Sequence, residues 1–92
     1  MNVVWSQTAV DTYLHVTDYI FTRWTQREVA NFQTAVDSLL DRIMENNHLC
    51  PESKLLGYRK CVVSKQTSLI YSVKNNFILL VTFIDSKTDH KF

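Results

Sequence analysis

A chain of 92 residues that is 46% hydrophobic and holds one Gly and one Pro has the size of one small domain, residues 1–92, with little room for a linker or a disordered tail. Ten Lys and Arg against nine Asp and Glu give a net charge of +1, which argues against a protein held to nucleic acid by bulk charge alone. The cationic side chains gather in the second half of the chain, so any contact with a polyanion must be local to that half.

The two cysteines, Cys50 and Cys61, belong to a chain with no signal peptide and no apolar run near the roughly 18 residues of a membrane span. We therefore expect a cytoplasmic protein with no membrane contact, whose cysteines are free thiols and act as small buried hydrophobes. His48 lies close to Cys50, but no second Cys/His pair is near enough to complete a zinc site. The sequence predicts no metal and no organic cofactor.

The chain begins with a short apolar segment, residues 2–5, which is typical of a strand that leads into a helix. Either Ser6 or Thr8 can cap that helix by accepting a free backbone N–H of its first turn. Apolar residues then recur at steps of three and four up to Trp24, so one helix face is apolar. We expect both Trp5 and Trp24 in the core.

A capping box at residues 25–28, Thr-Gln-Arg-Glu, starts a second helix. From Val29 to Ile43 the apolar side chains again step by three and four, which makes a continuous stripe. Asn46 and Asn47 are expected to end this helix through a left-handed cap. Because almost no linker separates the two helices, they must form an antiparallel hairpin whose stripes face a common surface.

Three runs rich in β-branched and aromatic residues follow at residues 58–63, 68–73 and 77–84, separated by short polar segments of hairpin size. The order strand, helix, helix, strand, strand, strand predicts an α+β domain in which the helix hairpin packs on a mainly antiparallel four-stranded sheet. The last run is apolar at almost every position. Both of its faces must therefore be covered, the second by the C-terminal tail, by residues 48–57 or by another protein.

A set of short motifs occurs in a fixed order along nearly the whole chain. It comprises Trp5 before the first helix, Ala30-x-Phe32 in the second, Pro51…Gly57-Tyr58-Arg59, Leu69-Ile70-Tyr71-x-Val73, Ile78-Leu79-x-Val81 and Asp85-Ser86-Lys87. This ordered set resembles the RelE/ParE superfamily of toxins from type II toxin–antitoxin systems. The resemblance implies a small bacterial cytoplasmic toxin and, as its partner, a cognate antitoxin that wraps it and blocks its working surface.

The resemblance is compatible with two different toxin activities. RelE-like toxins bind the ribosome and cut mRNA through attack of a ribose 2′-hydroxyl on the adjacent phosphate, whereas ParE-like toxins inhibit DNA gyrase and carry no nuclease site. Cleavage needs a proton acceptor, cations around the phosphorane and an acid for the leaving oxygen. In the RelE pattern the candidate catalytic residues are Arg59, Lys87 and His90. Lys54 and Lys60 are candidate contacts to RNA or another target, and we expect Arg59, Lys60, Lys87 and His90 to converge near one sheet face.

Several positions depart from that pattern. Cys61 and Ser68 stand where RelE-like enzymes are basic, and Lys87 replaces an Arg, so it cannot offer a phosphate a bidentate fork. Loss of such a group commonly costs on the order of 100-fold in rate. We predict a weak RelE-like, metal-independent endoribonuclease; the alternatives are a ParE-like gyrase inhibitor or an inactive domain of the same fold. For Arg59 the plain explanation is a solvated edge charge, and for His90 a frayed tail residue.

The amount of apolar surface also predicts that this protein assembles with a partner chain. A chain of this size buries only about 60–65% of the surface that its unfolded form exposes, and the helix stripes and the last strand carry more apolar surface than it can hide. An antitoxin helix in a groove, or an antitoxin strand added to the sheet edge, would cover the remainder. A homodimer through the helix hairpin would use the same surface, so both assemblies stay open.

Overall fold

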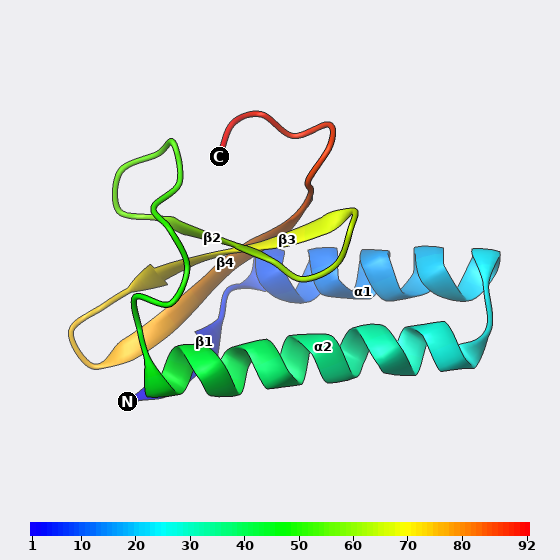
Figure 1. Cartoon of the computed structure of the whole chain (residues 1–92), viewed down its shortest axis with the longest axis horizontal. Coiled ribbons are helices and arrows are strands. Elements are labelled where there is room, and N and C mark those ends of the chain that lie inside the picture. The colour runs from blue at the N-terminus through cyan, green and yellow to red at the C-terminus, as the bar shows by residue number, and fades with distance from the viewer.

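A computed structural model describes all 92 residues as two helices on one side of a four-stranded sheet (Figure 1). Its elements are β1 (Asn2–Trp5), α1 (Gln7–Arg23), α2 (Gln26–Glu45), β2 (Arg59–Val62), β3 (Thr67–Val73) and β4 (Phe77–Asp85). The strands lie in the order β1-β4-β3-β2, with β1 parallel to β4 and the other neighbours antiparallel. The predicted architecture is confirmed, and the observed strand ends differ from the predicted ones by one residue at most.

Both helices begin at the predicted caps. Of the two candidates for α1, Ser6 is the cap, since its hydroxyl accepts the Ala9 N–H at 2.9 Å. The capping box of α2 is formed by Thr25 and Glu28, which exchange side-chain and backbone hydrogen bonds. The Thr25 hydroxyl, followed by the backbone amides, lowers the pKa of the Glu28 carboxyl below its ordinary value. Each cap satisfies amides that the first turn leaves free.

The end of α2 differs from the prediction. Asn46 has extended backbone angles, φ −139° and ψ 98°, and no residue other than Gly57 has a positive φ, so the expected left-handed cap is wrong. Instead, the Asn47 side-chain amide donates to the Ile43 carbonyl at 2.9 Å. A side chain thus satisfies one of the last carbonyls of the helix, and the backbone has no need to reverse. Neither α1 nor α2 is long and apolar enough to cross a lipid bilayer.

The core fills the space between the helices and the sheet. Its members are Ala9, Phe32, Val36, Leu39, Ile43, Cys50, Cys61, Leu69, Tyr71, Ile78, Leu80 and Phe83. Trp5 packs against this core, as predicted, with its ring 5.2 Å from that of Tyr13. Trp24, in contrast, is 54% exposed, so its prediction as a core residue is wrong. The far end of the helix hairpin extends beyond the sheet, which leaves no strand beneath it (Figure 1).

A bulge in β4 decides which of its side chains reach the core. The pairing between β3 and β4 shifts so that Val81 opposes no residue of β3. Since side chains alternate along a strand, the extra residue lets Leu80 and Phe83 both face the helices. The first helix satisfies the backbone there: the Phe83 N–H donates to Thr12 Oγ1 at 3.0 Å, and the Ser6 hydroxyl donates to the Val81 carbonyl at 2.8 Å.

The sheet face away from the helices is covered by two segments of the same chain, residues 50–58 and residues 86–92, which lie above it in Figure 1. The Ser72 hydroxyl donates to the Gly57 carbonyl at 2.9 Å, and Ser68 Oγ lies 2.5 Å from Ser86 Oγ. On the same side of the last strand, β4, Thr82 and Ile84 are buried and Leu79 is half-buried, so the prediction that both faces of this strand are covered is confirmed. Of the three coverings considered, the chain itself supplies two, the loop and the tail.

The loop and the tail also hold each other. The Lys54 N–H donates to the Phe92 carbonyl at 3.0 Å, and the Tyr58 and Phe92 rings meet edge to face with centroids 5.9 Å apart. The two segments therefore form one covering layer.

Cys50 and Cys61 form a disulfide with a Cα–Cα distance of 5.3 Å, so the expectation of free thiols is wrong. The two residues are 11 apart in the sequence. They meet because the loop after α2 runs along the outer edge of β2, where the Lys60 N–H donates to the Pro51 carbonyl at 3.0 Å. The prediction of free thiols rested on the expected cytoplasmic location of the protein. The pairing of the loop with the edge of β2 is what brings the two sulfur atoms together. Both cysteines are buried, as predicted.

Candidate functional site

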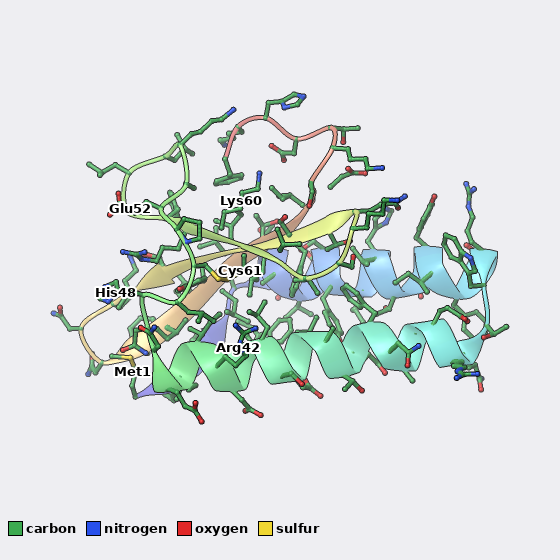
Figure 2. All side chains as sticks on the ribbon, viewed as in Figure 1. Met1, Arg42, His48, Glu52, Lys60 and Cys61 are labelled. Carbon is green, nitrogen blue, oxygen red and sulfur yellow. A yellow bond between two sulfur atoms is a disulfide. The ribbon has the colours of Figure 1, made fainter.

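The predicted site residues on β2 lie on opposite faces of the sheet. Arg59 pairs with Tyr71 and shares the helix side with Cys61, whereas Lys60 pairs with Ile70 on the other side. Figure 2 shows Lys60 toward the loop and the C-terminal tail, and Cys61 toward the helices. The expected convergence of Arg59 with the other cationic candidates on one face is therefore wrong. Adjacent strand residues point in opposite directions, and this period of two was the signal that the sequence analysis missed.

Arg59 is held by the loop that follows α2. Its Nη1 donates to the Cys50 carbonyl at 2.7 Å, and its Nη2 lies 3.8 Å from Glu52 Oε1. The Arg59 side chain is only 21% exposed, while that of Glu52 is 70% exposed. The charge of Arg59 thus has structural partners that it would have to leave in part to reach a phosphate.

Tyr71 lies next to this arginine and ties the same loop to the sheet. Its hydroxyl donates to the Asn47 carbonyl at 2.8 Å and accepts the Cys50 N–H at 3.4 Å. Burial raises the pKa of the Tyr71 phenol, while the Cys50 amide and the Arg59 charge act in the opposite direction. A buried phenol held in the protonated form is a structural hydrogen-bond donor here, in agreement with the prediction of Tyr71 as a core residue.

The remaining cationic candidates lie on the side of the sheet away from the helices. We call Lys54, Lys60, Lys87 and His90 the cationic face. Lys54 belongs to the loop, and its Nζ donates to the His90 carbonyl at 3.5 Å. Lys87 and His90 are exposed in the C-terminal segment, which crosses this side of the molecule (Figure 1). Lysines act as flexible point charges toward phosphate, and the imidazole of His90 has ring nitrogens that can donate or accept a proton.

The two positions where RelE-like enzymes are basic have structural roles in this chain. Cys61 is part of the disulfide, and Ser68 is fully buried with its hydroxyl against that of Ser86. A cation at either position would lose these contacts and would have to be buried beside the sheet. The cationic face therefore combines lysines and one histidine without an arginine fork.

An apolar groove of about 670 Å³ lies under the overhanging end of the helix hairpin. Its apolar lining comprises Val16, Tyr19, Ile20, Trp24, Phe32, Ala35, Phe83 and Ile84. Charged residues stand around it, among them Glu28, Lys65 and Asp85. Trp24 and Tyr19 are substantially exposed in this groove, and their rings lie 6.4 Å apart. The sequence analysis placed Trp24 in the core. Trp24 is the last apolar residue of the stripe on the first helix, and this position at the helix end was the sign that it could lie beyond the sheet.

No protein-family model matches the sequence, and neither does any curated protein sequence. Solved structures do match. A chain of the chromosomal ParDE toxin–antitoxin system from P. aeruginosa superposes with a TM-score of 0.78 at 14% identity, over 92% of this chain and 95% of that one. The YoeB dimer from Staphylococcus aureus gives a TM-score of 0.66 at 22% identity, over 91% and 94% of the two chains. A chain of the YoeB–YefM complex from Staphylococcus aureus gives a TM-score of 0.65 at 22% identity, again over 91% of this chain and 94% of the other.

These matches define the class of fold: the chain is an α+β domain with the RelE/ParE fold. The resemblance found in the motifs is confirmed at this level, because the structures superpose over more than nine tenths of each chain. At 14% to 22% identity, the likeness is one of fold, and function has to be argued from the residues of this chain.

Proposed function

We propose that this chain is the toxin of a type II toxin–antitoxin system and that a cognate antitoxin neutralises it. The observation that carries the proposal is the RelE/ParE fold, shared over nearly the full length of both chains with proteins described as members of such systems. The motifs along the sequence point to the same class. Growth arrest on expression without an antitoxin is the expected activity.

The apolar groove supports an antitoxin partner. It exposes aromatic side chains at Tyr19 and Trp24, and charged side chains surround it. An amphipathic antitoxin segment would place its apolar side chains in the groove and its charged ones at the edge. YoeB from Staphylococcus aureus is described both as a dimer and in complex with YefM. We propose a hetero-oligomer with antitoxin for this chain, with a homodimer as the alternative assembly of the free toxin.

Of the two activities in the superfamily, inhibition of DNA gyrase without nuclease chemistry agrees better with the geometry. Arg59 is engaged by Cys50 and Glu52, and the basic positions of RelE-like enzymes are occupied by Cys61 and Ser68. A ribonuclease transition state needs several cations aimed at one phosphate. Binding to a protein target has no such requirement.

Ribosome-dependent mRNA cleavage is the second candidate, and the cationic face is the observation that favours it. In that case Lys87 stabilises charge on the phosphorane, His90 transfers the proton, and Lys54 and Lys60 hold the RNA backbone. Arg59, the third catalytic candidate, lies on the opposite face of the sheet and would have to leave both Cys50 and Glu52 to contribute to this chemistry. The chemistry requires no metal.

Inducible expression in a bacterial host separates these candidates. Incorporation of labelled methionine and of labelled thymidine is followed separately in the first minutes. A fall in thymidine incorporation, with inhibition of purified gyrase in a supercoiling assay, supports the first candidate. A fall in methionine incorporation, with cleavage of ribosome-bound message, supports the second. If expression leaves growth and both incorporations unchanged, the toxin proposal fails and the inactive domain takes its place.

Variants of the cationic face sharpen that result. The double change Lys60→Ala/Lys87→Ala and the single change His90→Ala should each lower mRNA cleavage by about 100-fold or more if the second candidate holds. Lys74→Ala is the matched control, because Lys74 is an exposed lysine in the turn between β3 and β4. Equal activity of all these variants would remove the cationic face from the mechanism.

A further inference from the structure

The Cys50–Cys61 disulfide joins the loop after α2 to the edge strand β2. Both cysteines are buried, with exposures of 8% for Cys50 and 1% for Cys61. Cys61 is part of a strand that pairs with β3, so it keeps its place without the bond. Cys50 belongs to a segment without helix or strand, and its position depends on what holds it. The disulfide is therefore a covalent tie between a fixed element and a loop.

Apart from the ion pair of Glu52 with Arg59 and the ring contact of Tyr58 with Phe92, the other contacts of this loop are individual hydrogen bonds. The Cys50 carbonyl accepts from Arg59, the Lys60 N–H donates to Pro51, and the Ser53 N–H donates to Tyr58. Most side chains between Pro51 and Gly57 are exposed or half-buried, and Leu56 at the tip is 92% exposed. Little apolar surface thus holds the loop, and segments of this kind open locally without global unfolding.

Most of the core lies outside the loop, which contributes only Cys50 to it. The fully buried side chains of α2, β3 and β4, such as Val36, Leu69 and Leu80, pack between the helices and the sheet. The loop does carry part of the cationic face, because Lys54 contacts the carbonyls of His90 and Phe92 in the tail. A change in the loop therefore reaches the C-terminal tail and leaves the core in place.

We propose that Cys50 and Cys61 form a redox switch with two folded states. In the disulfide state the loop is tied to β2 and the covering layer is complete, and in the dithiol state the loop and the tail open together. The inference goes beyond the proposed function and does not rest on it, since it concerns the molecule whatever its target.

The switch operates by thiol–disulfide exchange with a low-molecular-weight thiol such as glutathione. After local opening of the loop, a glutathione thiolate attacks Cys50 Sγ, the more exposed end of the bond, and Cys61 leaves as the thiolate. A second glutathione thiolate attacks the glutathione sulfur of the mixed disulfide and releases Cys50. The products are two protein thiols and one glutathione disulfide, so two electrons pass to the protein and the protons come from the two glutathione thiols. Glutathione disulfide drives the reverse reaction.

The test uses the purified chain equilibrated at a series of ratios of reduced to oxidised glutathione. Rapid alkylation and mass measurement give the fraction of dithiol, and amide hydrogen exchange is recorded on the same samples. On reduction, exchange should become about 10-fold faster or more in residues 50–58 and 86–92, with no change at the buried amides of β3 and β4. The change in exchange should follow the dithiol fraction.

Two variants serve as references. Cys50→Ser/Cys61→Ser should exchange like the reduced chain at every glutathione ratio. Leu56→Ala, an exposed substitution in the same loop, should respond like the unmodified chain. If the double variant does not fold, the comparison between the reduced and the oxidised unmodified chain is the test of the proposal. The switch is ruled out if the bond persists until β3 and β4 unfold, if reduction itself unfolds the core, or if exchange in the loop is equal in both states.

Discussion

The two faces of the sheet are built in different ways. On the helix side, large apolar side chains such as Ile78 and Leu80 are fully buried between strands and helices. On the other side, the sheet presents serines at 68 and 72 on either side of the fully buried Ile70, and a loop and a tail cover them through individual hydrogen bonds. The disulfide fixes the start of that loop from the helix side. The difference separates a face that stabilises the fold from a face that can rearrange while the fold persists.

The physical basis is the free energy that each of the two kinds of contact contributes. Full burial of a Leu or Ile side chain contributes about 1.5–3 kcal/mol, and many such side chains act together in the core. A single intramolecular hydrogen bond contributes about 0.5–1.5 kcal/mol after its exchange with water. The covering layer carries Lys54, Lys87 and His90 of the cationic face, so the side of the sheet with the weaker contacts is the one that carries most of the candidate functional groups.

The largest effect is expected in the core. Leu80→Ala should lower the free energy of unfolding by about 3 kcal/mol, because it opens a cavity at a side chain with no exposed surface. Urea denaturation monitored by circular dichroism measures this. Leu56→Ala is the control, a Leu that is 92% exposed, and should stay within about 0.5 kcal/mol of the unmodified chain. Similar losses in both variants would contradict the contrast between the core and the covering layer.

The second largest loss of stability is expected from removal of the disulfide. In oxidising buffer, Cys50→Ser/Cys61→Ser should lose about 2–3 kcal/mol of unfolding free energy, the amount expected for release of a short closed loop. The unmodified chain in reducing buffer should lose a similar amount, whereas the double variant should be insensitive to reductant. A stability that is the same with and without reductant for the unmodified chain would show that the bond contributes nothing.

A smaller loss is expected where α1 meets the bulge of β4. Ser6→Ala removes both the helix cap to Ala9 and the bond to the Val81 carbonyl, so unfolding free energy should fall by about 1–2 kcal/mol. Ser38→Ala, at an exposed position of α2 whose side chain makes no hydrogen bond, is the matched control. Equal denaturation midpoints for the two variants would remove Ser6 from the stabilising contacts.

The smallest global effect is expected in the tail. Phe92→Ala removes the edge-to-face contact with Tyr58 and should change the unfolding free energy by no more than about 1 kcal/mol. Its effect should appear in hydrogen exchange, as faster exchange in residues 50–58 with unchanged exchange in β3. Thr88→Ala, an exposed position in the same tail, should leave both unchanged. A global loss like that of Leu80→Ala would place the tail in the cooperative core.

Local patterns determined the elements and their order. The apolar periodicity predicted both helices, and the β-branched runs predicted three of the strands within one residue. The capping box of residues 25–28 marked the start of the second helix, whereas the first had two candidate caps, Ser6 and Thr8. These features depend on contacts between residues close in the sequence. The fold class followed, because few arrangements bury a helix hairpin against a sheet built in this order.

The candidate site was predictable only in part. The sequence showed that cations gather in the second half of the chain, and the alternation of Arg59 and Lys60 was available in it as well. The engagement of Arg59 by Cys50 and Glu52 was not, because those contacts arise from a loop whose path no periodic pattern describes.

By itself, the sequence determined the helices, the strands, the capping box of the second helix and the choice of fold, since each is encoded in spacings of a few residues. Only the tertiary structure decided the bulge at Val81, the exposure of Trp24, the Cys50–Cys61 bond and the placement of Arg59. Each of these depends on where an irregular backbone or an element's end lies relative to a distant part of the chain. That position is set by packing in three dimensions, and no local spacing records it.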